Sequence, residues 1–353
     1  MAINNRVFYA IQAVGFAPNG RAPTQSGFTH IPSGFTVAHG VQSIGIDTNF
    51  NLEPVFELGQ LELYENIEGI PEVEVTAQKV LDGYPLLYHL ATPSAASSSL
   101  VGRSNARSFV ALNIYPDTFD NASGLPIQVV GMSGMFVSSL TYTLNVEGNS
   151  TEDVTLVGNN KVWLASGYVT FRPNFNGTDA PLSLASSGGV QRREDVLMGQ
   201  SANSSRWPTA IPGITSSGTN PLQAGGDALS AHIQTVTISA DLGREELFEL
   251  GLRAPYHRFV TFPVEVTCGI EITTTEGDLV QALADPPTGT NLVDETIIVR
   301  MREGTVLNLG TKNKLASITY GGGDATGGNA TVTYNYSNNN SLTVTHPQDP
   351  AGL

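Results

Sequence analysis

The sequence predicts a mainly β protein: two tandem copies of one antiparallel β-sandwich or barrel domain, each with one flanking helix. The first observation behind this prediction is an internal repeat. Residues 41–59 (VQSIGIDTNFNLEPVFELG) match residues 233–251 (IQTVTISADLGREELFELG) at a constant offset of 192 (233 − 41), and 7 of the 19 positions are identical. A repeat of this length indicates a duplicated structural unit.

The second observation is that the match continues further along the chain. Residues 73–76 (VEVT) correspond to 264–267 (VEVT), and residues 139–142 (SLTY) correspond to 317–320 (SITY). Because equivalent positions of one fold have similar surroundings, we expect paired residues to share their burial. The pairs are Phe56 with Phe248, Ile46 with Ile238, and Tyr142 with Tyr320.

The third observation is that apolar and polar residues alternate with a period of two, which predicts strands. We expect strands at 73–76, 109–115 and 138–146 in the first copy and at 233–238, 264–273, 297–301 and 330–336 in the second. Clusters rich in glycine, such as 321–328, predict the turns between them. One helix candidate follows the VEVT strand in each copy, at 80–91 and at 276–285.

These patterns divide the chain into four segments. We expect an N-terminal arm at 1–35 that begins with a strand at 7–12, a first repeat domain at 36–165, a connecting arm at 166–230 and a second repeat domain at 231–353. The connecting arm is longer than a tether requires. Its apolar residues would be wasted in solvent, so we expect them to contact neighbouring chains; they are Leu197, Met198, Trp207 and Ile211.

The charge of the chain is uneven. Of the net charge of −15, the four segments carry +2, −10, 0 and −7 in order, so the acidic residues are concentrated in the two repeat domains. Charged residues make up only 14% of the chain. No basic stripe is present to neutralise phosphates, which argues against a protein that binds duplex DNA or RNA by charge.

No pattern for catalysis or for binding a metal or a cofactor emerges. The 6 histidines do not have the spacing of a metal site. Acid pairs such as Glu72 with Glu74 suggest a glycosidase, but alternation puts both on the wet face of one strand. We therefore expect no enzyme activity, no cofactor and no metal. The single cysteine, Cys268, lies in an apolar strand pattern and is expected in the core.

The opening residues, MAINNRVFYA, lack the basic start and apolar run of a secretory leader, and no apolar run has the length of a membrane span. We therefore expect the protein to be made in the cytoplasm and not to insert into a membrane.

Residues 56–91 (FELGQLELYENIEGIPEVEVTAQKVLDGYPLLYHLA), their counterpart at 248–285 and the closing NLGTKNKLASITYGGGDATGGNATVTYNY resemble tail tube proteins of long-tailed bacteriophages. The resemblance implies β-sandwich domains that form stacked rings of six around a DNA-conducting channel. In members with two fused domains, a homotrimer forms the pseudo-hexameric ring. It also implies a place in the virion and sheath, tail-terminator or baseplate proteins as partners.

A channel that conducts DNA needs a wall that does not bind phosphates, so the acids of the repeat domains are candidates to face the lumen. They are Asp47, Glu72, Glu74, Glu265 and Glu271. The viral DNA is then expected to pass without specific binding. One alternative stays open: a two-domain β-sandwich adhesin or receptor-binding virion protein, for which exposed aromatic residues are expected to cluster at one end.

Overall fold

We analysed a computed structural model of the chain. It describes residues 7, 12–18, 34–59, 61–93, 95, 97–115, 125–165, 188–198, 203–214, 231–275, 277–281, 293–323 and 328–349. The described part is mainly β, with long antiparallel sheets and few, short helices, as the sequence predicts. Most of the expected strand at 7–12 lies outside the described residues.

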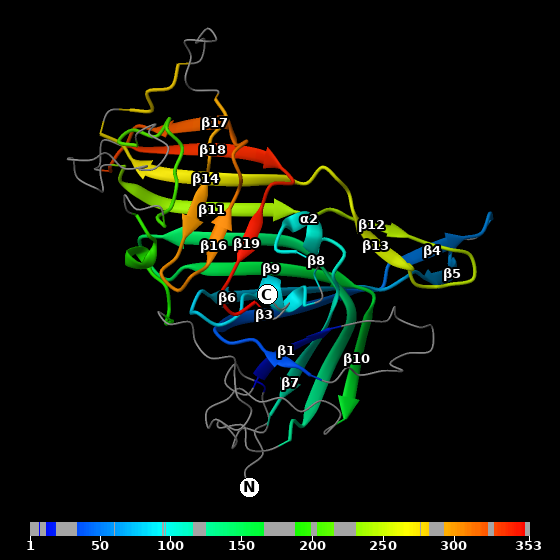
Figure 1. The fold of residues 1–353 in the computed structure, drawn as a ribbon. Helices are drawn as coiled ribbons and strands as arrows, with labels where there is room; N and C mark the ends of the chain where they lie inside the picture. Colours follow the sequence, from blue (N-terminus) through cyan, green and yellow to red (C-terminus); the bar gives the residue numbers. More distant parts are fainter. Residues whose placement is uncertain are drawn as a thin grey trace.

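The main feature of the fold is one eight-stranded antiparallel run that extends through both halves of the chain (Figure 1). Four strands come from the first half and four from the second. In spatial order they are β3 (Val41–Asn49), β6 (Glu72–Val80), β9 (Thr151–Gly158), β8 (Gln128–Asn145), β11 (Ile233–Asp241), β14 (Glu265–Thr273), β18 (Thr331–Asn339) and β17 (Lys314–Gly321). The two halves are therefore joined edge to edge, by the pairing of β8 with β11.

A second layer of shorter strands packs on one face of this sheet. In the first half, the N-terminal part of β8 pairs with β10 (Asn160–Ala165) and with β7 (Ser108–Ile114), which pairs with β1 (Gln12–Pro18), which pairs with β2 (Thr36–Val37). In the second half, β15 (Ile298–Arg300), β16 (Val306–Asn308) and β19 (Thr343–Thr345) form a three-stranded sheet that lies in front of the long run in Figure 1.

The two second layers have the same plan. The order β10–β8–β7–β1 in the first half corresponds to β19–β16–β15 in the second, where an isolated bridge between Arg206 and Ile298 takes the place of β1. The long strand β8 corresponds to two separate strands, β16 and β17. Part of the connecting segment thus lies beside β15 in the second half, as β1 lies beside β7 in the first half.

Two hairpins project from the sheet on the same side (Figure 1). The first consists of β4 (Leu52–Phe56) and β5 (Leu63–Glu68), and the second of β12 (Arg244–Leu247) and β13 (His257–Val260). At the corresponding ends of β4 and β12 the chain passes through Gly59 and Gly251, with φ of 92° and 90°. Glycine adopts this left-handed conformation without the steric cost of a Cβ.

The repeat is visible at the level of single irregularities. The pairing of β3 with β6 shifts register between Val41 and Ser43, and the pairing of β11 with β14 shifts at the equivalent place. The residue in the bulge is glutamine in both halves. Gln42 donates its side-chain amide to the carbonyl of Gly40, and Gln234 donates to the carbonyl of His232. A bulge kept with its side-chain bond indicates descent from one ancestral unit.

The pairing registers also show how the matched segments align. The β8–β9 pairing shifts between Val137 and Ser139, and the β17–β18 pairing shifts between Leu315 and Ser317, so the SLTY and SITY segments are structurally equivalent. The VEVT match is two residues out of register. Thr48 is opposite Val73, while its equivalent in β11 is opposite Val266 rather than Val264. A slip of two keeps every side chain on its face, so the alternation pattern cannot reveal it.

The expectation of shared burial is right for one pair and wrong for two. Phe56 and Phe248 are both exposed. Ile46 is half-buried while Ile238 is buried, and Tyr142 is fully buried while Tyr320 is 53% exposed. The reason is position within the run. Tyr142 and Ile238 lie at the joint between halves, whereas Ile46 and Tyr320 lie on the two outermost strands.

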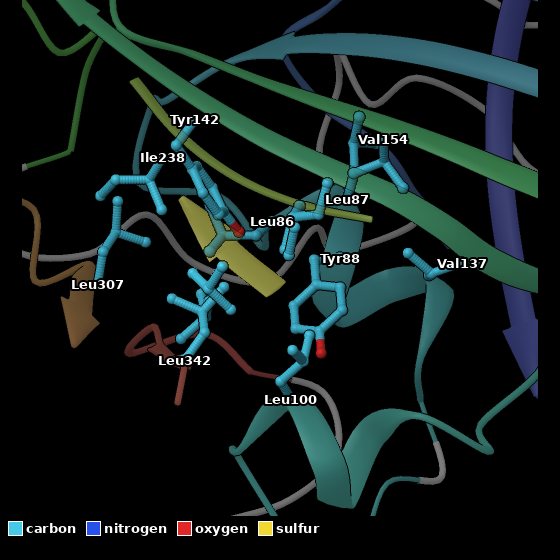
Figure 2. Packing of buried hydrophobic residues seen from close by; sticks show 14 of the residues in the cluster. Leu86, Leu87, Tyr88, Leu100, Val137, Tyr142, Val154, Ile238, Leu307 and Leu342 are labelled. Atoms are coloured by element: carbon cyan, nitrogen blue, oxygen red, sulfur yellow. The ribbon is translucent and has the colours of Figure 1, made fainter. Parts of the chain in front are cut away.

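One hydrophobic core lies between the layers and takes side chains from both halves. Figure 2 shows Leu86, Leu87 and Tyr88 of the first half in the same cluster as Ile238, Leu307 and Leu342 of the second. Cys268 is also buried there, as expected, and burial raises the pKa of its thiol to about 12.

The helices are shorter than the sequence predicts. In the first half α1 covers Leu87–Ala91 and α2 covers Leu100–Arg103, while the residues before α1 continue β6 or follow an irregular path. In the second half residues 277–281 are not helical, with Gly277 and Leu279 at positive φ, and the rest of 276–285 lies outside the described residues. The prediction at 277–281 is therefore wrong, because Thr274 and Gly277 form a local turn through the threonine hydroxyl.

Candidate functional site

The candidate site is a set of surfaces rather than a pocket, and the first surface is the outer face of the eight-stranded run. Alternation along each strand puts one set of side chains in the core and the other on this face. The outer set is almost entirely small and polar. On the inner strands it comprises Ser139, Thr141, Thr143, Thr151, Asp153, Thr155, Thr235, Thr237, Ser239, Thr267, Glu271, Thr333, Asn335 and Ser337.

Side chains on this face are tied to one another across the strands. Gln78 donates to Asp153 at 2.9 Å, and the hydroxyls of Ser239 and Thr267 lie 2.7 Å apart. The face therefore presents ordered hydroxyls and carboxylates instead of long flexible side chains.

The five acids singled out in the sequence all lie on this outer face. Asp47, Glu72, Glu74 and Glu265 are exposed, and Glu271 is half-buried. Asp47 is directly opposite Glu74 on the neighbouring strand, an arrangement of like charges that costs stability. Glu72 differs from the others because Arg258 lies 3.4 Å from it. Among the outward-pointing residues of the eight described strands, Lys314 is the one basic residue, and it is ion-paired with Asp294 at 3.0 Å.

The second surface consists of the two open edges of the run. Among the described strands, β3 pairs only with β6, and β17 pairs only with β18. Each edge carries apolar residues that reach only partly into the core. Ile44 and Ile46 do so on β3, and Leu315 and Ile318 do so on β17. Their equivalents at the internal joint are fully buried.

The internal joint shows how two such edges fit together. Strands β8 and β11 pair from Thr235 opposite Asn145 to Asp241 opposite Ser139. Arg244 of the second half reinforces the joint, since its Nε donates to the carbonyl of Val137 at 2.8 Å and its Nη1 donates to the carbonyl of Ser104 at 2.6 Å. Burial lowers the pKa of this arginine to about 10, so it stays a cation at neutral pH.

The third surface is formed by the two hairpins. Their exposed large apolar residues are Phe50, Leu52, Phe56, Leu58, Leu61, Leu63, Tyr64 and Ile67 in the first and Phe248, Leu250, Leu252, Tyr256, Phe259 and Phe262 in the second. The hairpins touch, because Arg253 lies 3.7 Å from Glu68 and donates to the carbonyl of Gly69 at 3.3 Å. Exposed large apolar residues gathered on one side of a protein are typical of an interaction site. The alternation pattern does not indicate this surface, although the FELG repeated in both copies belongs to it.

Buried ionisable groups lie on the opposite, core side and serve structure. Glu152 accepts the N–H groups of Leu87 and Tyr88 and the hydroxyl of Tyr142, and burial raises the pKa of its carboxyl. Lys79 is ion-paired with Asp82. Among the described residues no three His, Cys, Asp or Glu side chains gather as metal ligands would.

The connecting arm is placed differently from the sequence-based expectation. Trp207 and Ile211 are buried in the core of their own chain, so their side chains are not available to a neighbour. Met198 packs partly against the same core. Leu197 is half-buried, and its N–H donates to the carbonyl of Arg300. The described part of the arm, residues 188–198 and 203–214, is hydrogen-bonded to Leu81, Asp82 and Ser150 of the first half and to Ile298 and Arg300 of the second. Contact of Leu197 or Met198 with another chain stays a prediction.

No protein-family model and no curated protein matches the sequence. Among solved structures, one similar chain belongs to the anti-feeding prophage baseplate, determined by cryo-EM with six-fold symmetry. It shares 12% identity with a TM-score of 0.33, over 46% of this chain and 97% of that one. A likeness this weak leaves fold and function to be argued from the chain itself. Among the residues of this protein that the structure describes, no helix is long and apolar enough to cross a membrane.

Proposed function

We propose that this protein is a structural subunit of a bacteriophage tail, and specifically a tail tube protein with two fused tube domains. Three chains close into a pseudo-hexameric ring, and rings stack into the channel that conducts viral DNA. The subunit acts by assembly and carries out no catalysis.

The observation that carries this proposal is the internal joint. One chain already contains two equivalent four-stranded units joined edge to edge, and it leaves two complementary edges open. Head-to-tail contacts of this kind generate rings when the rotation closes. Closure also covers the edges, which otherwise favour aggregation.

The outer face supports the assignment of a channel wall. Besides hydroxyls, this face carries the side chains of seven acidic residues. They are Asp47, Glu72, Glu74, Asp153, Asp241, Glu265 and Glu271. A wall of this charge repels phosphates and displaces no counterions from DNA, so a duplex slides past it. The opposition of Asp47 and Glu74 costs stability, which a role in solubility alone does not explain.

The hairpins supply the contacts between rings in this proposal. They project from one side of the sheet (Figure 1), and both carry exposed large apolar residues, as a surface for stacking requires. Sheath, terminator and baseplate proteins are further partners of such a tube.

The test is electron microscopy of the purified full-length chain in negative stain, over a range of concentrations. Rings with a central bore and stacks of rings are expected, with light scattering giving the mass of a trimer. A protein that stays monomeric at high concentration, without rings, would contradict the proposal.

A second candidate function is a receptor-binding or adhesin protein of a virion. One observation favours it: exposed aromatic residues do cluster at one end, with Phe56 and Tyr64 on the first hairpin and Phe248 and Tyr256 on the second. Under this reading the hairpins bind a host surface. Binding of the isolated chain to host cells without ring formation would select this candidate.

A further inference from the structure

We infer that β17 of one chain pairs with β3 of a second copy of this chain, antiparallel and in the register of the internal joint. This inference rests on the proposed ring and adds its partner strands and residue pairs. Tyr320 is then opposite Ile46 of the neighbour, Thr319 is opposite Asp47, and Ser317 is opposite Asn49.

The register follows from two equivalences established within the chain. Strand β3 corresponds to β11 at the offset of 192, because both carry the glutamine bulge. Strand β17 corresponds to β8 at an offset of 178 (317 − 139), because both carry a bulge just before the SLTY or SITY segment. At the joint, Ile238 is opposite Tyr142. Subtracting 192 and adding 178 gives Ile46 and Tyr320.

Burial supports these pairs independently of the register. At the joint Tyr142 is 0% exposed and Ile238 is 1% exposed. Their equivalents on the open edges are a half-buried isoleucine and a tyrosine that is 53% exposed. The same holds for Ile318, which is half-buried where Leu140 is buried. On each edge, these side chains are at least partly exposed because no described strand lies beside them. Pairing of one edge with the other would bury both sets.

Neither edge is short or contains proline, and the bulge on each edge recurs on β11 or β8, which pair with each other despite it. Strand β3 is 9 residues long and contains neither proline nor lysine. Strand β17 is 8 residues long, and its lysine stands at its first position, before the bulge. Edge strands of monomeric proteins are commonly short, charged or interrupted by proline.

Contacts beside the strands differ between the internal joint and the inferred one. The position of Arg244 is taken by Leu52 in the first copy, and the position of Phe136 is taken by Lys314 (136 + 178). Arg244 lies over the ring of Phe136, 5.2 Å from its centre. At the inferred joint the basic and apolar partners are exchanged, so the two joints are related but not interchangeable.

Disulfide trapping on assembled full-length protein tests the register. Facing residues of antiparallel strands have Cα atoms about 4.5–5.5 Å apart, which suits a disulfide, whereas diagonal neighbours are about 7–8 Å apart and do not. The in-register variant is Asp47→Cys with Thr319→Cys, and the shifted variant is Asp47→Cys with Ser317→Cys. All three positions are exposed in the single chain.

The chain supplies its own positive control. Thr141 and Ser239 are opposite one another at the internal joint and are equivalent to Thr319 and Asp47. Thr141→Cys with Ser239→Cys should oxidise within one chain and shift its mobility on a non-reducing gel. In the in-register variant, covalent dimers and trimers should replace the monomer band. Adding a reducing agent should restore the monomer band.

Three results would overturn the inference. Stronger cross-linking of the shifted variant means a different register. Dimers from Thr319→Cys alone mean that two β17 edges pair about a two-fold axis. Rings in the microscope without cross-links, while the control pair oxidises, mean that the ring closes through other surfaces and leave the proposed function standing. In-register cross-links without rings would support the pairing and contradict the tube.

Discussion

Tyr142 donates a hydrogen bond to Glu152 across the β8–β9 pair, with 2.9 Å between the phenol oxygen and the carboxyl oxygen. The same carboxyl accepts the N–H of Leu87 at 2.6 Å and that of Tyr88 at 3.1 Å. One buried side chain on the sheet thereby holds the first turn of α1 against the core. The equivalent tyrosine in the second half, Tyr320, is exposed on an outer edge.

The first prediction compares these two tyrosines. Tyr142→Phe removes a bond to a fully buried carboxyl, so we expect the free energy of unfolding to fall by about 1–3 kcal/mol. Tyr320→Phe should change it by less than about 0.5 kcal/mol in the dilute, unassembled chain. Urea unfolding followed by circular dichroism measures both. Equal effects of the two substitutions would contradict the network.

The second prediction concerns Glu303, which is buried and whose pKa is raised to about 7, chiefly by burial and then by Asp82. The folded chain holds this proton more firmly than the unfolded chain, whose carboxyl titrates near 4.5. The stability that the protonated Glu303 carboxyl contributes is therefore complete below about pH 4.5 and is lost as pH rises through 7. The free energy of unfolding falls by about 3 kcal/mol over this range.

Glu303→Gln should remove that pH dependence and raise stability at pH 8. Thermal unfolding between pH 4.5 and 8 measures the difference from the parent chain. A Glu303→Gln profile parallel to that of the parent would show that this carboxyl does not titrate in the window.

The third prediction tests the charge of the proposed channel wall. Glu74→Lys with Glu271→Lys should make assembled tubes retain duplex DNA, because lysines on the wall release counterions from phosphates. The retention should weaken steeply as salt rises. The matched control is Glu147→Lys with Glu194→Lys, which makes the same change of charge at two exposed acids outside the strands and the hairpins. If both variants retain DNA equally, the outer face is not the wall.

The fourth prediction concerns the hairpins. Leu58→Ser with Leu250→Ser changes two fully exposed side chains, so the stability of the single chain should stay within about 0.5 kcal/mol. Rings should still form, and stacking should fail because the apolar contact is lost. Electron microscopy gives the ratio of single rings to tubes. Val101→Ser, an exposed apolar change on α2, is the control and should leave tube length unaffected.

The sequence was informative wherever strands alternate and bulges recur. It predicted the equivalence of β3 with β11 and of β8 with β17, and the outward direction of acids such as Glu74. It did not predict that the halves share one core, because tertiary contact between distant segments has no local pattern. The prediction that Trp207 and Ile211 contact neighbouring chains was wrong for the same reason: a segment without periodicity can still be buried in its own chain through isolated bridges.

Some failures have a narrower physical cause. Alternation has a period of two, so it cannot show whether Val264 or Val266 is the structural equivalent of Val73 in the second half. Burial of Tyr320 depends on whether another strand lies beside it, which a single chain does not specify. The apolar hairpins resemble core strands in sequence, and only the fold shows that Phe56 and Phe248 point into solvent.

The covalent link between β8 and β11 gives a ring of this kind two sorts of seam. Seams inside a chain are reinforced by Arg244 and cannot separate while the backbone is intact. In the proposed ring, the contacts between chains would have Leu52 at the position of Arg244 and would depend on association alone. Such a ring can dissociate only at the contacts between chains, so its smallest product is one chain with two fused units. Mutations can then change the contact between chains without changing the contact inside a chain.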